Sequence, residues 1–432
     1  MRITFFGGAQ EVGRACMLLE EGKRNLMLDC GIKLGERTEY PVLDDSELKR
    51  INSITVSHAH LDHSGYLPHV YSKKARPRIF LTKPTRDLMG ILLSDYCRIR
   101  NLRGEQQMFS IRDVDRVMKD AVITEYNTPI KADFTTTFFP AGHIMGSAIT
   151  AIEEGGQRIV YSGDICMRKT RVLDACERNM HARTLIVEST YGKKGEILPS
   201  YKDSYQKMVK IINETLDKGG HVIIPSFAVG RAQEVLLALD DYMRSGALRQ
   251  SRIYIEGMIG KAMKIYRHNA IYANDDIKKR ILMSEDDPFK SPNFHMSRSK
   301  TREDVLKEPA IIVTTSGMLT GGPVMFYLEK LGNDPKNTII FVGYQAAGTP
   351  GKKVIEGQRR IRIGNKEIEL RLRVESIKVS GHADFNELLQ FIKSFKGLEK
   401  VFLMHGERAD LREYLEDDYE VLVPRLLETY SI

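Results

Sequence analysis

The stretch "TVSHAHLDHSGYLPH", residues 55–69, holds four histidines and one aspartate in fifteen positions. His58 and His60 are two residues apart, a spacing that puts both side chains on one side of an extended segment. Asp62 and His63 follow where we expect the chain to turn toward a helix. Imidazoles and carboxylates are the ligands that zinc takes when cysteine is absent. The stretch therefore predicts a metal site, and because one loop cannot close such a site, distant ligands are required.

Short β-rich runs elsewhere in the chain end at polar residues that are suited to this role. "RNLMLDCG" ends at Asp29, "TTTFFPAGH" near His143, "QRIVYSGD" at Asp164, "RTLIVEST" at Glu188 and "KVFLMHGE" at His405. Polar residues at strand ends usually lie on loops beyond a sheet edge, where binding and catalytic sites are built. These strand ends therefore predict the rim of one site. His69, the fourth histidine of the stretch, is expected to have a surface or packing role.

Length and composition fit a soluble globular protein with two domains, or with one domain and a large insertion. The chain has 432 residues, a formal charge of +8 and five scattered cysteines without a C-x-x-C pair. The cysteines argue against a disulfide framework and against a cysteine-based zinc finger. The start is not a signal peptide, and no apolar run is long enough to span a bilayer, so we expect a cytoplasmic protein without a membrane partner. The basic balance suits a polyanion such as nucleic acid, although it is weak support on its own.

The H-x-H-x-D-H pattern with a later His, Asp and His resembles the metallo-β-lactamase superfamily. The resemblance implies two zinc ions, with Asp62 also counted among the catalytic residues and Asp29 holding the His-x-His loop without binding metal. A site with a single metal stays an alternative. The implied ligands are His58, His60 and His143 for the first ion, Asp62, His63 and His405 for the second, and Asp164 between them.

The middle of the chain narrows the resemblance. "PSFAVGRAQEVL" (225–236), "TTSGMLTGGP" (314–323) and "GYQAAGTPGKKV" (343–354) resemble the β-CASP domain, an insert found in nucleases of this superfamily. The implied fold class is α/β: a metallo-β-lactamase αββα sandwich with an inserted β-CASP α/β domain. We expect a first part over 1–193, the insert over 194–372 and a closing part over 373–432. The whole pattern looks like an archaeal homologue of the cleavage and polyadenylation specificity factor nuclease, related to RNase J.

Two further residues match motifs of that group. His382 in "SGHAD" is the candidate general acid, and Glu188 would orient it and keep it protonated, since a nearby carboxylate favours imidazolium. The glycine-flanked pairs Ser316–Gly317 and Ser380–Gly381 offer backbone N–H groups to phosphates, and Arg231 is a candidate contact to the RNA backbone. For Ser316–Gly317, a tight turn that needs glycine is an equally good explanation.

The resemblance implies a zinc-dependent ribonuclease that hydrolyses single-stranded RNA by two-metal catalysis. We expect a 5′-to-3′ exonuclease that favours a 5′-monophosphate, with endonuclease activity in addition, and the resemblance is compatible with a homodimer. The alternatives are a DNA repair nuclease of the β-CASP group, a small-molecule hydrolase and a catalytically inactive RNA-binding scaffold. An insert of about 180 residues disfavours the small-molecule hydrolase, because it is large enough to be a domain of its own. The complete ligand set disfavours the scaffold.

Overall fold

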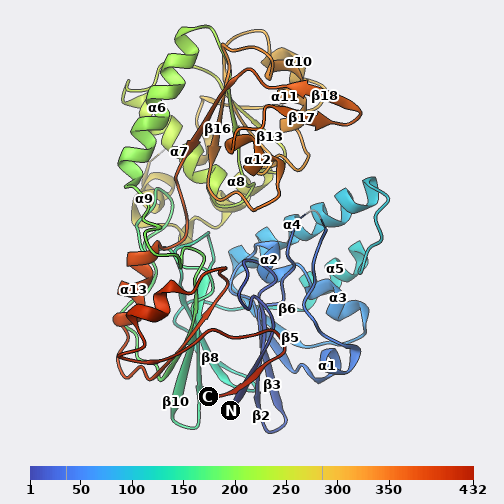
Figure 1. Ribbon diagram of the computed structural model, residues 1–432, viewed down its shortest axis with the longest axis vertical. Helices are drawn as coiled ribbons and strands as arrows, with labels where there is room; N and C mark the ends of the chain where they lie inside the picture. The colour runs from blue at the N-terminus through green and yellow to red at the C-terminus, as the bar shows by residue number, and fades with distance from the viewer. Residues whose placement is uncertain (36, 285) are drawn as a thin grey trace. The chain divides into compact units, whose positions relative to one another are not determined.

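Two mixed sheets of seven strands each build the first unit of this computed structural model (Figure 1). The structure describes residues 1–35, 37–284 and 286–432. The first unit comprises Met1–Lys169, Leu173–Ile197 and His382–Ile432, and the second comprises Thr170–Val172 and Leu198–Gly381.

The two sheets of the first unit have matching designs, with parallel strands at one side and antiparallel strands at the other. The first sheet has the order β22 (Thr429–Ser431), β1 (Arg2–Gly7), β2 (Cys16–Glu21), β3 (Arg24–Leu28), β4 (Ser53–Thr55), β5 (Arg78–Leu81) and β6 (Ala121–Ile123). The second has the order β21 (Glu420–Leu422), β20 (Lys400–Met404), β11 (Thr184–Glu188), β10 (Gln157–Tyr161), β9 (Ala148–Glu154), β8 (Thr135–Pro140) and β7 (Ile130–Lys131).

A buried apolar layer joins the two sheets face to face. It includes Phe5 and Leu28 of the first sheet and Ile159 and Phe402 of the second. Helices cover the outer faces: α13 packs its apolar side on the second sheet, whereas α4 and α5 lie against β5 and β6 of the first (Figure 1). The short helices α2 and α3 contact α4 and α5, respectively, and η3 contacts α13. The helices are α1 (Asp45–Arg50), α2 (Leu61–Ser64), α3 (Leu67–Ser72), α4 (Lys83–Leu102), α5 (Ile111–Asp120), η3 (Asp410–Tyr414) and α13 (Phe385–Lys393). The predicted αββα sandwich is confirmed.

The end of the chain completes both sheets. β20 and β21 extend the second sheet by parallel pairing with β11, and β22 pairs antiparallel with β1. The two chain ends therefore lie side by side (Figure 1). A segment more than 180 residues downstream of β11 thus supplies its direct neighbour, so the first unit folds around a long insertion.

The second unit is built on one parallel sheet of six strands. Its central strands β12, β15 and β16 are buried throughout and almost wholly apolar, as expected when helices cover both faces. The strand order is β14 (Phe294–Met296), β13 (Ile253–Glu256), β15 (Ile311–Thr314), β12 (Val222–Pro225), β16 (Thr338–Val342) and β19 (Arg373–Ile377). A separate hairpin joins β17 (Arg360–Ile363) to β18 (Lys366–Glu369). The helices are α6 (Tyr201–Asp217), α7 (Arg231–Arg244), α8 (Ile259–His268), η1 (Ala270–Tyr272), α9 (Asp275–Met283), η2 (Pro288–Lys290), α10 (Arg302–Val305), α11 (Val324–Leu331) and α12 (Pro350–Ile355).

The second unit is the α/β insert that the sequence predicts. The predicted domain ranges 1–193, 194–372 and 373–432 stay a prediction. Among the described residues, no helix combines the length and the apolar character that crossing a bilayer requires.

Candidate metal centre

The histidine-rich stretch runs from the carboxyl end of β4 through α2 and into α3. His60 is the N-cap residue of α2, and Asp62 and His63 lie in the first turn of that helix. The chain therefore changes from extended to helical between His58 and His63, which turns the side chains of one short loop in two directions. Both His58 and His63 are completely buried. Gly31 makes this packing possible, because a Cβ there would lie 1.7 Å from the carbonyl oxygen of Asp62.

Three histidines, His58, His60 and His143, converge on one side of the cluster. The Nδ1 atom of His60 lies 3.2 Å from Nε2 of His58 and 3.2 Å from Nε2 of His143. His143 comes from the loop between β8 and β9, where its backbone N–H donates to the hydroxyl of Ser147. One nitrogen from each of the three rings lies within 4.8 Å of the other two, so the set can hold one metal ion.

A second group gathers around His63, Asp164 and His405, whose ligand atoms also lie within 4.8 Å of one another. His405 follows β20 with a positive φ of 51°, a backbone conformation that is uncommon outside glycine. Its Nε2 accepts a hydrogen bond from the Gly13 N–H at 3.0 Å and lies 3.7 Å from Oδ2 of Asp62. Imidazole and carboxylate groups thus surround a second position.

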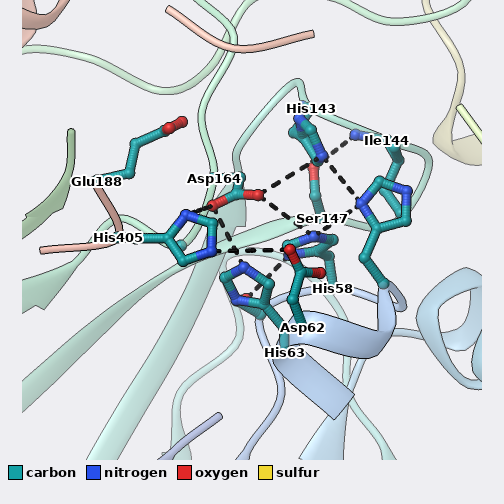
Figure 2. A network of polar contacts seen from close by, with 12 residues as sticks. His58, Asp62, His63, His143, Ile144, Ser147, Asp164, Glu188 and His405 are labelled. Carbon is teal, nitrogen blue, oxygen red and sulfur yellow. Dashed lines mark hydrogen bonds and ion pairs between the residues drawn. The ribbon is translucent and has the colours of Figure 1, made fainter. Parts of the chain in front are cut away.

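Asp164, just after β10, lies between the two groups and presents a different oxygen to each (Figure 2). Its Oδ2 is 3.6 Å from Nε2 of His58 and 3.7 Å from Nε2 of His143. Its Oδ1 is 3.4 Å from Nε2 of His63 and 3.4 Å from Nδ1 of His405. The Oδ1 atom and Nε2 of His63 are buried without a hydrogen-bond partner among the described residues. Buried polar atoms are nearly always paired, so these two call for an ion that they can bind.

Asp29 supports the loop from behind. This fully buried residue, at φ 57°, accepts hydrogen bonds from the backbone N–H and the hydroxyl of Ser57, each at 2.6 Å, and from the hydroxyl of Tyr161 at 2.6 Å. Its Oδ2 also lies 2.7 Å from Nδ1 of His63. With a proton on that nitrogen, Nε2 of His63, which lies 3.4 Å from Oδ1 of Asp164, would be the ring atom able to bind an ion. Sequence reasoning missed Ser57 and Tyr161, although each precedes a ligand motif by one to three positions.

His382 and Glu188 form an adjacent pair. Nδ1 of His382 is 2.9 Å from Oε2 of the buried Glu188, whose Oε1 accepts the backbone N–H of Ile165 at 2.7 Å. The His382 ring lies 4.5 Å from that of His143, centroid to centroid, and its Nδ1 is 4.0 Å from Oδ2 of Asp164. The pair therefore borders the cluster, with the Glu188 carboxylate fixed by the backbone of the strand end that carries Asp164.

Burial and neighbouring charges shift the pKa values in this cluster, raising some and lowering others. Burial would lower the pKa of His382, but the Glu188 and Asp164 carboxylates outweigh it and raise the pKa to about 9. Burial also opposes charge on His63, yet Asp164 and Asp29 raise its pKa above the usual value. The pKa of His58 is lowered by burial and by the neighbouring His63. Burial would raise the pKa of Asp164, but the surrounding histidines hold it well below its usual range.

His69 lies outside these groups. It is buried on α3, its Nδ1 lies 2.9 Å from the carbonyl oxygen of Met108, and its ring lies 4.7 Å from that of Tyr66. Its contacts are those of a packed residue.

The expected RNA-binding residues all lie in the second unit. Arg231 begins α7 directly after Gly230. Ser316 and Gly317 follow β15, where the Ser316 hydroxyl accepts the Thr320 N–H at 3.0 Å. Ser380 and Gly381 end the unit, and the Ser380 carbonyl oxygen accepts the Tyr201 hydroxyl at 2.6 Å. Arg231 and Ser316–Gly317 thus stand at the carboxyl ends of neighbouring parallel strands, where ligands of open α/β sheets bind.

Three family models match successive parts of the chain. Residues 18–190 match the metallo-beta-lactamase superfamily domain, residues 232–354 the Beta-Casp domain, and residues 367–424 the Zn-dependent metallo-hydrolase RNA specificity domain.

The chain is also similar to whole archaeal proteins. An RNase J-like protein of Methanocaldococcus jannaschii is 38% identical, over 94% of this chain and 92% of that protein. A transcription termination factor, FttA, of Methanothermobacter thermautotrophicus is 36% identical, over 100% of this chain and 72% of that protein. A crystal structure of a protein of unknown function from Enterococcus faecalis shares the fold, with a TM-score of 0.60 at 14% identity over 99% of each chain.

Proposed function

The chain belongs to the β-CASP group of the metallo-β-lactamase superfamily and is a metal-dependent ribonuclease, and we propose that it hydrolyses single-stranded RNA with two zinc ions held by the histidine and aspartate cluster. The observation that carries this proposal is the position of Asp164, whose two carboxylate oxygens face two separate groups of ligands. Such a bridging carboxylate suits a pair of ions that act on one phosphate.

The residues present fit such a pair. His58, His60 and His143 would hold one ion, Asp62, His63 and His405 the other, and Asp164 both. All five cysteines are buried and none is part of these groups, so the donors are nitrogen and oxygen atoms, which zinc accepts. His63 Nε2 and Asp164 Oδ1, which make no hydrogen bond among the described residues, would both bind an ion placed between them. Asp29 would fix the orientation and basicity of His63, as the outer partners of metal-bound histidines do.

Zinc, when bound, supplies an activated water and neutralises charge on the scissile phosphate. The protein contributes the rest of the reaction. His382, kept protonated by Glu188, donates its proton to the oxygen that leaves when the phosphorus–oxygen bond breaks. Glu188 holds the ring in place and stabilises its positive charge, which makes Glu188 a positioning residue.

The second unit would bind the RNA backbone. Between residues 198 and 381 the chain carries 30 Lys and Arg against 21 Asp and Glu, whereas the other residues carry 35 against 36. The basic excess of the whole chain therefore resides in the inserted unit. Arg231 and the backbone N–H groups of Gly317 and Ser380–Gly381 are the proposed phosphate contacts. The Ser316 N–H already donates to the Gly321 carbonyl oxygen at 3.2 Å.

We also propose a 5′-to-3′ direction with a preference for a 5′-monophosphate, together with some endonuclease activity. The test uses one RNA with a 5′-monophosphate, a 5′-triphosphate or a 5′-hydroxyl, labelled at each end in turn. The expected result is rapid release of short products from the 5′ end of the monophosphate form. Internal fragments in equal amounts from all three substrates would contradict the direction and leave the ribonuclease itself intact.

Two-metal catalysis is tested by metal content and activity together. Purified protein should contain about two zinc ions per chain by elemental analysis, and removal of the ions by a chelator should abolish RNA cleavage until zinc is restored. His60→Ala should lose zinc and activity. His181→Ala, which removes an exposed histidine outside the cluster, is the matched control and should retain both.

A protein that binds zinc and cleaves only DNA would establish the DNA repair alternative, and one that binds RNA without cleaving it would establish the scaffold. A homodimer and a cytoplasmic location stay predictions, which light scattering and cell fractionation test.

A further inference from the structure

Phe227 stands out among the aromatic residues of the second unit. It is 37% exposed, more than any other of the sixteen phenylalanines, all of which lie within the described part of the chain. It lies in the loop between β12 and α7, where its neighbours Ser226, Ala228 and Val229 are all buried. The loop thus packs its other side chains inward and presents one aromatic ring to the outside.

Hydrogen bonds fix the conformation of the loop that carries this ring. The Gly230 N–H donates to Oε1 of Gln233 at 2.7 Å, and Nε2 of Gln233 donates back to the Ala228 carbonyl oxygen at 3.0 Å. Gly317, on the loop after β15, packs directly against the Phe227 backbone, because a Cβ there would lie 3.0 Å from the Phe227 N atom and 3.5 Å from its ring. Because hydrogen bonds fix the loop, the exposed ring is held in one position, which is a preorganised arrangement for binding.

A cationic side chain accompanies the ring. Arg231, four residues further along at the start of α7, is half-buried, and its side chain lies against Gly343 at the end of β16. No described carboxylate lies within ion-pair distance of its guanidinium group. The three loops that carry Phe227, Gly317 and Gly343 leave β12, β15 and β16, which are neighbours in the parallel sheet. An exposed aromatic ring and a half-buried guanidinium group therefore occur together at one sheet edge.

We propose that Phe227 is a base-stacking residue, which packs its ring on a nucleobase of the single-stranded RNA while Arg231 contacts the adjoining phosphate. This inference rests on the proposed ribonuclease function and extends it to a contact with the bases. Sites for single-stranded nucleic acid combine aromatic faces with a positively charged track in this way. Every base has a π face, so the contact strengthens binding without selecting a sequence.

The composition of the chain makes a direct optical test possible. The protein contains no tryptophan, so Phe227→Trp introduces a single indole at the proposed contact. Rapid mixing of this holoenzyme variant with single-stranded RNA should quench the indole fluorescence before cleavage begins. An oligonucleotide of the same length with abasic sites, and inorganic polyphosphate, should leave the fluorescence unchanged. Ile271→Trp places the indole at another exposed position of the same unit and should show no quenching.

Steady-state kinetics supply the second readout. Phe227→Ala should raise KM about five- to a hundred-fold, the effect of losing one base–aromatic stack, with a smaller change in kcat. Phe227→Tyr should restore the wild-type KM, whereas Phe227→Leu, which is apolar but has no π face, should not. Equal quenching by abasic RNA, quenching of the same size in the Ile271→Trp variant, or full rescue by leucine would overturn the inference.

The two proposals fail separately. If wild-type protein cleaves RNA with zinc but the Phe227 variants behave as wild type, base stacking is refuted and the ribonuclease remains. If the wild-type holoenzyme cleaves no RNA, the proposed function fails whatever the fluorescence of the Phe227→Trp variant shows.

Discussion

Among the single residues of the site, Asp29 shows how a group that binds no metal can govern one that does. It accepts hydrogen bonds from Ser57 and Tyr161, and its carboxylate faces Nδ1 of His63. The aspartate charge therefore fixes which ring nitrogen of His63 is available to an ion. Its positive φ is tolerated because Asp enters the left-handed region more readily than most residues do.

Asp29→Asn keeps the shape of this side chain and removes its charge. We expect zinc affinity to fall about 10- to 100-fold, the usual effect of changing the outer partner of a ligand. Competition with a fluorescent chelator measures it. Tyr161→Phe removes one of the hydrogen bonds to Asp29 and should cause a smaller loss in the same direction. An unchanged affinity in Asp29→Asn would contradict the role of Asp29.

The protonation of His382 gives a prediction about pH. Against the effect of burial, Glu188 and Asp164 raise its pKa to about 9, and bound zinc, being positive, lowers it from there. Because the protonated ring is the proposed acid, kcat should fall as pH rises through this pKa. Glu188→Gln removes the larger of the two carboxylate effects, so the pKa of His382 should fall. The alkaline limb of the kcat profile should therefore move to lower pH. The profile of kcat against pH measures the shift. If the alkaline limb lies at the same pH in Glu188→Gln and in the wild type, the limb reports a group other than His382.

Among the secondary-structure elements, the close approach of α2 to the end of β3 shapes the site. The Cys30 N–H donates to the His63 carbonyl oxygen at 2.8 Å, and the Ala15 N–H donates to that of Asp62 at 2.8 Å. Backbone hydrogen bonds therefore hold the ligand loop against the sheet. Gly31 sits in this contact, where any side chain would strike the backbone of Asp62 and His63.

Gly31→Ala should displace this loop. We expect the free energy of unfolding to fall by about 1–3 kcal/mol, which is the usual cost of overpacking a well-packed interior. Bound zinc should be lost as well. Chemical denaturation and elemental analysis measure the two effects. Gly90→Ala is the control, since the new methyl group in α4 would meet only the flexible end of Met118. Retention of both stability and zinc in Gly31→Ala would show that the loop can shift without harm.

Over the molecule as a whole, charge is divided unevenly along the chain, with the basic excess between residues 198 and 381. RNA binding through phosphate contacts should therefore weaken steeply with salt, by about 0.7 in log affinity per log unit of salt for each contact to a single strand. Arg231→Gln should reduce the magnitude of that slope by the share of one phosphate contact, about 0.7. Arg249→Gln removes a charge that is already paired with Asp217 at 3.0 Å, and it should leave the slope unchanged. Equal slopes in the wild type and Arg231→Gln would remove Arg231 from the RNA contacts.

Short stretches of sequence predicted a metal site and the class of the fold, and the fold class is confirmed. Histidine and aspartate side chains at strand ends predicted a metal site, because such ends commonly lie on loops at the edge of a sheet, and the insert motifs predicted a second α/β unit. These signals are local, since each comes from a few consecutive residues.

Which atoms meet could be learned only from the folded chain. That Oδ1 and Oδ2 of Asp164 face different histidines, and that Tyr161 reaches Asp29, depends on contacts between residues about a hundred or more positions apart. Phe227 gives the same lesson, because its exposure and the packing of the Gly317 loop against its backbone are seen only in the folded chain.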